Sequence, residues 1–367
     1  MRTVSVLLDR ERQGGWMRRS CVVVGVSIFV GTFAVAGVCV AQNKLYGPGI
    51  TDVDGLKLGH FTLDERPTGC TVVLAEGGAV GGVDVRGGAP GTRELALLDP
   101  VSTVQEVHAV VLSGGSTYGL DAASGVMRYL EEHGVGLRVG AHIIPIVTGA
   151  ILFDLGIGDG SIRPGPECGY QAASVATTIK PVEGSIGAGA GATVGKLQGL
   201  GSAMKGGIGT ASITLDDGLT VAAVVAVNAV GDVVDPTTGE VVAGIRDMDG
   251  GFLDARKLLR NTRPESPAGA NTTIGVVATN ASLTQAQATK MAQMAHDGLA
   301  RAIYPAHTPG DGDTIFALAT GTRIGGPSLT VLGGLAADVL TEAILRAVRT
   351  AKGLPGIPSV SELGANR

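Results

Sequence analysis

The chain has 367 residues and a formal net charge of −5, with 33 acidic and 28 basic residues interspersed along it. No basic stripe or basic tail is present, which argues against nucleic-acid binding. The 59 glycines follow no three-residue period, so a collagen-like fold is excluded and many tight turns are expected. No linker separates two independent cores, and we predict one large domain over residues 42–367.

The N-terminal segment, residues 1–41, has the pattern of a secretory signal. A basic stretch, Met17–Ser20, precedes the apolar run Cys21–Ala41, and a small residue stands before polar Gln42. Met17 is a plausible translation start. The apolar run is about as long as the shortest membrane-spanning helices, so an uncleaved anchor over residues 21–41 is the alternative. We expect a periplasmic or secreted protein, or one anchored to a membrane by this segment.

Several segments alternate or run apolar in the way that strands do. The Asp216–Gly218 step between two of them predicts a tight antiparallel hairpin, because glycine supplies the positive φ that such a turn needs. The predicted strands are Cys70–Leu74, Glu106–Leu112, Ser212–Leu215, Leu219–Val227, Thr272–Thr279 and Thr314–Ala319.

Three segments show helical spacing. Leu120–His133 is followed by Gly134, a typical helix stop. A capping box at Ser282 and Gln285 predicts a second helix, which places Met291, Ala295 and Leu299 on one face. The third helix carries its apolar face on Leu335, Val339, Ile344 and Val348 and ends before Gly353. Hairpins with helices between and after them favour an α+β fold in layers.

We expect no cofactor and no metal site. The glycine run Gly187–Gly195 precedes Lys196, but Leu197 follows where a phosphate loop needs Ser or Thr. The six histidines show no paired metal-ligand spacing. Outside the N-terminal segment, Cys70 and Cys168 are the remaining cysteines, and two cysteines make no metal-site spacing or disulfide framework. We predict that both are buried thiols, and the sequence leaves open whether they pair.

Thr272 lies where a Pro- and Gly-rich stretch, Asn261–Ala270, meets a predicted core strand. A cut between Asn271 and Thr272 would present the hydroxyl and a new α-amino group together at the sheet edge. Threonine activated by its own N-terminal amine is a recognised nucleophile. The alternative is an ordinary turn that enters a strand, or a chance glycosylation sequon.

Two other residues could assist Thr272. Lys196 follows small residues and could lie in an apolar pocket, where it would lower the pKa of the amine or carry the proton itself. Asn228 interrupts the apolar run Val221–Val227, so its amide must find partners. Its NH2 group could donate to an oxyanion. The alternatives are a solvated lysine and a cap at the end of a strand.

Asp311 and Asp313 immediately precede a predicted strand, and their side chains share one side if the backbone is extended there. One carboxylate could orient the Thr272 hydroxyl or ammonium while the other holds the first in place. Two adjacent carboxylates raise each other's pKa, which would help one of them accept the hydroxyl proton during self-cleavage. A polar turn is the alternative.

The order of six motifs resembles the self-processing aminopeptidases of the DmpA type, with β-peptidyl aminopeptidases and nylon-oligomer hydrolases as relatives. The resemblance covers about residues 50–348. It rests on Ile50–Gly59, Arg86–Gly91, Gly114–Gly119, Gly206–Ala211, Ala270–Ile274 and His307–Phe316.

The resemblance implies a four-layer αββα sandwich, similar to ornithine acetyltransferases, and cleavage into fragments 42–271 and 272–367. It matches Thr272 to the nucleophile, Lys196 to the assisting lysine and Asn228 to the oxyanion donor. It matches Asp311 and Asp313 to the orienting acids of the nylon-hydrolase branch. The chain departs from the pattern at Phe153, where relatives carry a tyrosine near the substrate, and this leaves the substrate type open.

The sequence therefore predicts a self-cleaving amide hydrolase, most simply an aminopeptidase that acts on small peptides, amides or esters and assembles as a homo-oligomer. The alternatives are an endo-acting amidase for non-peptide linear amides, an acyltransferase, and an uncleaved binding protein without activity. They differ in whether the substrate needs a free amine, in whether an amine acceptor is used, and in whether the chain is cut at all.

Overall fold

A computed structural model describes residues 45–364 except 263–269, 324 and 327. The predicted signal or anchor and most of the Pro- and Gly-rich stretch therefore lie outside the described residues. Among the helices that the structure does describe, none is both long and apolar enough to cross a bilayer.

The six α-helices of the described chain are α1 Ala122–Glu132, α2 Pro166–Ser174, α3 Ala255–Asn261, α4 Gln285–Ala302, α5 Leu329–Arg349 and α6 Val360–Gly364. The longer strands are β1 Lys57–Thr62, β2 Gly69–Val85, β4 Glu106–Ser113, β7 Val147–Ile151, β10 Gly207–Thr214, β11 Thr220–Asn228, β14 Thr272–Ala281 and β16 Thr314–Arg323. The shorter strands are β3 Thr92–Arg93, β5 Leu137–Val139, β6 His142–Ile144, β8 Thr193–Val194, β9 Met204–Lys205, β12 Asp232–Val234, β13 Val241–Ala243 and β15 Ile303–Tyr304.

The main sheet has nine strands, in the order β10-β11-β14-β16-β2-β4-β7-β3 with β1 paired to β2. Strand β2 is 17 residues long and links two halves of this sheet. Its first part pairs with β1 and β4, and its last part, Val80–Val85, pairs with β16. The predicted strand Cys70–Leu74 is thus only the beginning of β2, because the glycines that follow do not end the pairing.

Three apolar cores separate four layers, which confirms the α+β sandwich. Alternate residues along a strand face opposite sides, so one strand serves two cores. On β11, Val221, Ala223, Val225 and Val227 pack in a core with α4 and α5, while Ala222, Val224 and Ala226 pack in the inner core. On β4, Val110 and Leu112 face the inner core, while Ala109 and Val111 pack in a core with α1 and α2.

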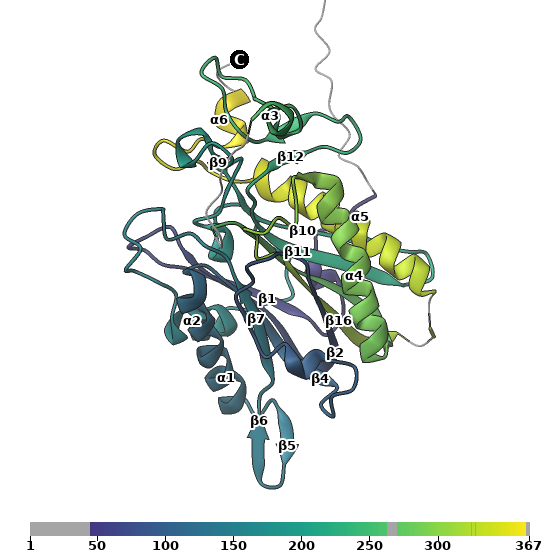
Figure 1. The fold of residues 1–367 in the computed structure, drawn as a ribbon. Helices are drawn as coiled ribbons and strands as arrows, with labels where there is room; N and C mark the ends of the chain where they lie inside the picture. Colours follow the sequence, from purple (N-terminus) through teal and green to yellow (C-terminus); the bar gives the residue numbers. More distant parts are fainter. Residues whose placement is uncertain (1–44, 263–269, 324, 327, 365–367) are drawn as a thin grey trace, which may run out of the picture. The chain divides into compact units, whose positions relative to one another are not determined.

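The helices therefore lie on both outer sides of the strands. Figure 1 shows α4 and α5 together on one side and α1 and α2 together on the other. Small residues allow α4 and α5 to approach closely: a Cβ on Gly298 would lie 2.1 Å from the Ala337 carbonyl oxygen. This close packing explains how a chain that is poor in aromatic residues fills its core.

Most predicted elements are confirmed, and one cap is corrected. The hairpin at Gly218, whose φ is 81°, joins antiparallel strands β10 and β11. Helix α4 exists, with Met291, Ala295 and Leu299 buried. Its capping box is formed by Thr284 and Gln287 instead of Ser282 and Gln285. The strand before it runs to Ala281, so the chain uses Ser282 and Leu283 to turn before the N-cap of the helix at Thr284.

Two further predictions concern α1 and the cysteines. Helix α1 is shorter than predicted at its start, because Ser116–Asp121 forms a 3₁₀ turn before it. Cys70 and Cys168 are both buried free thiols, as predicted.

Leu112→Ala tests the inner core. Leu112 is fully buried there, so its truncation should lower the free energy of unfolding by about 2–5 kcal/mol. Leu45→Ala is the matched control, because Leu45 is 61% exposed and should cost less than about 0.5 kcal/mol. Urea denaturation followed by circular dichroism measures both, and equal costs would contradict the assignment of this core.

Candidate active site

Thr272 begins a central strand of the sheet. β14 pairs with β11 on one side, in antiparallel register, and with β16 on the other, in parallel register. Thr272 therefore lies at the end of an interior strand and not at a sheet edge, and it is only 2% exposed. Its hydroxyl donates a hydrogen bond to the carbonyl oxygen of Asn271. The hydroxyl and the peptide bond predicted to be cut are thus in direct contact.

Asn228 lies opposite Thr272, at the last position of β11. Its Oδ1 accepts hydrogen bonds from the Thr193 backbone N–H at 3.0 Å and from Lys196 Nζ at 2.9 Å. Its Nδ2 donates to the Phe153 carbonyl oxygen at 2.9 Å. The Thr193 hydroxyl also donates to Oδ1, at 3.4 Å, so three donors on one end and one acceptor on the other fix the orientation of the amide. Since Nδ2 carries two hydrogens, one N–H remains after Phe153 is satisfied.

Lys196 connects Asn228 to Ala270, which precedes Asn271. Its Nζ donates to the Asn228 carbonyl oxygen at 2.8 Å and to that residue's Oδ1, and it reaches the Ala270 carbonyl oxygen at 3.3 Å. Burial lowers the pKa of Lys196 to about 7, although the charges of Asp311 and Asp154 oppose this shift. Three oxygen acceptors suit the three N–H groups of an ammonium. Lys196 is therefore an ammonium that titrates near neutral pH.

Asp311 and Asp313 lie beside the start of β14, and both are buried. They bond different backbone groups: Asp313 Oδ1 accepts from the Thr273 N–H at 2.7 Å, and Asp311 Oδ2 accepts from the Thr308 N–H at 2.7 Å. The two carboxylates therefore have different hydrogen-bond partners, although the charge of Asp313 acts on Asp311. Burial, followed by the charge of Asp313, raises the pKa of Asp311 to about 6. Asp311 can therefore exchange a proton near neutral pH.

Gly312, between the two acids, was not singled out from the sequence. Its backbone N–H donates to the Asn271 carbonyl oxygen at 2.9 Å. A Cβ at this position would lie 2.9 Å from Thr272 Oγ1 and 3.0 Å from the Ala89 carbonyl oxygen. The backbone can approach the Thr272 hydroxyl this closely because residue 312 is glycine. The Asp-Gly-Asp spacing is the sequence signal that could have identified it.

Phe153 takes part through its main chain. Its carbonyl oxygen holds Asn228 Nδ2, a contact that is independent of whether the side chain is Phe or Tyr. The prediction from the sequence concerned only the missing tyrosine hydroxyl and did not include this main-chain contact. The place of the Phe153 ring in a substrate pocket stays a prediction.

A buried ion pair lies directly behind Phe153. Arg66 Nη2 bonds Asp154 Oδ1 at 2.7 Å, and neither side chain has any exposed surface. Arg66 also donates to the carbonyl oxygens of Asp154, Ile157 and Ile162. This arrangement clamps the segment that presents the Phe153 carbonyl to Asn228. No local pattern predicts this pair, because 88 residues separate the two partners.

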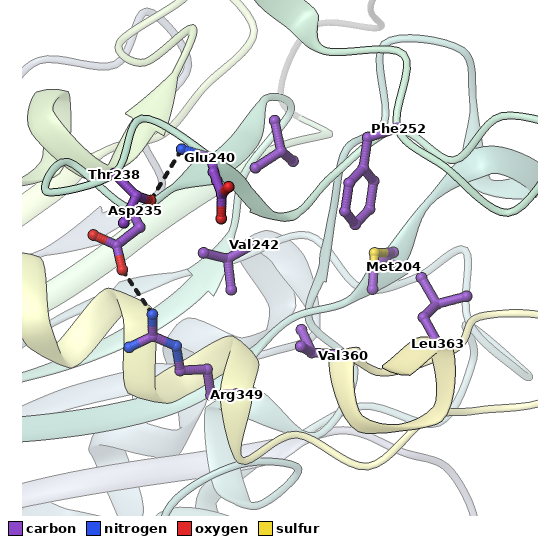
Figure 2. A pocket seen from close by; sticks show the side chains of 10 residues that line it. Met204, Asp235, Thr238, Glu240, Val242, Phe252, Arg349, Val360 and Leu363 are labelled. Atoms are coloured by element: carbon purple, nitrogen blue, oxygen red, sulfur yellow. Dashed lines mark hydrogen bonds and ion pairs between the residues drawn. The ribbon is translucent and has the colours of Figure 1, made fainter. Parts of the chain in front are cut away.

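The site residues do not line one cavity that the structure describes elsewhere on the chain. That cavity, of about 280 Å³, is lined by Met204, Asp235, Thr238, Glu240, Val241, Val242, Phe252, Arg349, Val360 and Leu363. Figure 2 shows Arg349 paired with Asp235 at its rim, at 2.8 Å. None of the residues predicted for catalysis contributes to its wall.

Arg66→Met tests the clamp. It leaves Asp154 as a buried charge without its cationic partner, so we expect a loss of about 3–5 kcal/mol in the free energy of unfolding. Arg128→Met is the matched control: its ion pair with Glu167 at 3.1 Å is exposed and should contribute less than about 1 kcal/mol. Chemical denaturation measures both. Equal free energies of unfolding for the two variants would show that the buried ion pair does not stabilise the fold more than the exposed one.

Comparisons with known proteins show the family of the chain. Residues 49–360 match the family model described as peptidase family S58. An aminopeptidase of Mycobacterium tuberculosis, named as uncharacterized, is 45% identical over 344 residues, which cover 86% of this chain and 97% of the relative. A 6-aminohexanoate-oligomer endohydrolase of Paenarthrobacter ureafaciens is 32% identical over 312 residues, which cover 81% of this chain and 84% of the relative.

Two solved structures share the fold. A β-aminopeptidase of a Burkholderia species has a TM-score of 0.62 and 24% identity, with 87% of this chain and 92% of that chain covered. The L-aminopeptidase D-Ala-esterase/amidase of Ochrobactrum anthropi, described as a variant of the Ntn hydrolase fold, has a TM-score of 0.63 and 20% identity. That match covers 84% of this chain and 89% of the other. By its family match and its 45% identical relatives, the chain belongs to peptidase family S58 and is a hydrolase of the aminopeptidase type.

Proposed function

We propose that the Thr272 hydroxyl cuts the chain after Asn271, and that the freed Thr272 is then the nucleophile that hydrolyses amide substrates. The observation that carries the proposal is the hydrogen bond from the buried Thr272 hydroxyl to the Asn271 carbonyl group. The carbonyl oxygen also accepts the Gly312 N–H, so a donor already faces the atom on which negative charge would develop.

The first reaction is an acyl shift within the chain. Oγ1 of Thr272 attacks the Asn271 carbonyl carbon while Asp311 accepts the hydroxyl proton. The peptide C–N bond breaks, the Thr272 nitrogen takes up a proton, and an ester joins Asn271 to the Thr272 oxygen. Water then hydrolyses the ester, which leaves a carboxylate on Asn271 and a free amine and hydroxyl on Thr272.

The second reaction uses the same hydroxyl on a substrate. The new α-amine of Thr272 accepts the hydroxyl proton, for which its usual pKa of about 8 is suitable. The Asn228 N–H that Phe153 leaves unused donates to the substrate oxyanion. Cleavage also removes the constraint on the Ala270 carbonyl that Lys196 holds, so one ammonium N–H becomes available to the substrate.

The acyl group that we propose is an N-terminal amino acid, as expected for an aminopeptidase. The second candidate is an endo-acting amidase for non-peptide linear amides. It is favoured by the relatives named 6-aminohexanoate-oligomer endohydrolase, at 31–32% identity. Rates on amino-acid p-nitroanilides and on their N-acetylated forms separate the two. An aminopeptidase requires the free amine, whereas an endo-acting enzyme accepts the blocked substrate.

Thr272→Ala should remain one chain and lose about 10⁴-fold or more in kcat/KM, because no other hydroxyl occupies this position. Thr272→Ser keeps a hydroxyl and should still yield two fragments. Denaturing gels and mass spectrometry of the fragment termini measure both. Thr273→Val is the matched control, since this neighbouring hydroxyl bonds no described residue. Two fragments from Thr272→Ala would refute the cleavage site.

The same mass measurement tests the N-terminus. We propose that residues 1–41 direct export and are removed, a proposal that rests on their sequence alone. The larger fragment should then begin at Gln42. A fragment that retains residues 21–41 and sediments with membranes would instead support an uncleaved anchor.

The rate of self-cleavage should form a bell against pH. Asp311 must lose its proton to act as a base, so the rate should rise as pH passes its pKa of about 6. The Lys196 ammonium loses its proton as pH passes about 7, and the rate should fall there. Gels of freshly synthesised chain incubated at a series of pH values measure this. Asp311→Asn removes the proposed base and should slow self-cleavage strongly at every pH. In the natural chain, a rate that keeps rising above neutral pH would assign the base to Lys196.

A further inference from the structure

His307 contacts one of the two site carboxylates twice. Its backbone N–H donates to Asp313 Oδ2 at 3.0 Å, and its Nδ1 lies 2.9 Å from the same oxygen. The other oxygen, Oδ1, accepts the Thr273 N–H at 2.7 Å. Asp313 is thus held between the residue that follows the nucleophile and the side chain of His307.

These contacts fix the proton positions on His307. A carboxylate only accepts hydrogen bonds, so the proton of the imidazole must be on Nδ1. Nε2 is buried and bonds no described residue. A proton on Nε2 as well would bury an unpaired N–H on a cation, which is costly. The geometry therefore favours the neutral ring with Nδ1–H.

The ring packs against a second neutral histidine. His296 of α4 lies edge to face with His307, with the ring centroids 4.8 Å apart. Its Nε2 lies 3.0 Å from the Asp84 carbonyl oxygen, so it carries the proton there. Burial lowers the pKa of His296 to about 4. His296 therefore brings no charge to His307 at neutral pH.

The remaining charges near these rings are on β2 and on the site itself. The Asp84 carboxylate lies 3.7 Å from His296 Nε2 and is paired with Arg86 at 2.8 Å, which compensates its charge. On the side of the nucleophile, Asp311 lies on the same loop as Asp313, and Lys196 acts on Asp311. Among the charged groups of the described chain, Asp313 is the one that bonds His307 directly.

The two carboxylates are therefore unequal. Asp313 accepts three N–H groups, from Thr273 and from the backbone and ring of His307. Asp311 accepts two hydrogen bonds from Thr308, one from its backbone N–H and one from its side chain. N–H donors favour the ionised form of a carboxylate. When two neighbouring acids share a site, the proton goes to the one with fewer donors.

We propose that His307 is a positioning residue that keeps Asp313 ionised and so directs the transferable proton of the site to Asp311. The inference rests on the proposed self-cleavage at Thr272 and adds to it the reason why two similar acids take different roles. His307 bonds Asp313, and Asp313 accepts the N–H of Thr273, the residue after the nucleophile. It acts through Asp313.

The backbone of His307 suggests matched variants. Its φ is 56°, in the left-handed region, where Asn and Gly are tolerated best. His307→Asn keeps this backbone and offers an Nδ2–H donor near the position of Nδ1. His307→Gly keeps the backbone and has no donor. The difference in pH dependence between the two variants therefore reports the side-chain hydrogen bond to Asp313, without a contribution from backbone strain.

The experiment compares the pH dependence of self-cleavage and of substrate hydrolysis in the natural chain and both variants. His307→Gly should move the acid limb to lower pH by about one unit, because a proton on Asp313 removes the charge that raises the pKa of Asp311. It should also lower kcat more than it raises KM. His307→Asn should return the limb towards its original place. An unmoved limb in His307→Gly, or equal shifts in both variants, would overturn the inference.

A second measurement does not depend on how the variants fold. ¹⁵N resonances of the histidines in the intact chain report the tautomer directly, and His307 should be neutral with its proton on Nδ1. An Nε2–H tautomer would overturn the inference. The Thr272→Ala chain separates the proposed function from the role of His307: if this chain is still cut, the proposed function fails. If it stays whole while His307→Gly keeps the natural pH profile, only the role of His307 fails.

Discussion

The register between β11 and β14 is the constraint on which the site depends. It places Asn228 opposite Thr272 on one face of the sheet, and a slip of β14 by one residue would turn the Thr272 side chain to the other face. The register is fixed by packing, because alternate residues of both strands belong to different cores. Lys196 and Phe153 then attach to Asn228, so the orientation of one amide sets their positions too.

Burial is what makes the ionisable groups of the site reactive. Lys196 and Asp311 both titrate nearer to neutral pH than free side chains do, and in each case loss of solvent is the largest cause. Their charges partly oppose these shifts, so each group limits the change in the other. A site of this kind can hold and release protons in the range where a threonine hydroxyl has to be activated.

The prediction of elements from the sequence succeeded where the signal is local. Gly218 forms the turn between β10 and β11 because glycine readily adopts a positive φ. The apolar face of α4 follows from the spacing of its apolar residues alone. Prediction was less successful where the pairing of distant strands sets the end of an element. β2 continues beyond Leu74 because β16 and β4 supply partners to its later residues, and the cap of α4 shifts to Thr284 because β14 extends to Ala281. Local residue preferences contain no information about these neighbours.

The sequence by itself determined which groups were available: a threonine at a loop-to-strand junction, an amide in an apolar strand, a lysine after small residues and two acids around a glycine. It also determined the family, through motifs in a fixed order. Only the tertiary structure decided how the groups pair. The Arg66–Asp154 clamp, the Phe153 carbonyl and the contact of His307 with Asp313 join groups through hydrogen bonds whose geometry depends on the folded backbone. A linear pattern records residue types and spacing, whereas the charge state of each acid depends on how many donors the fold brings to it.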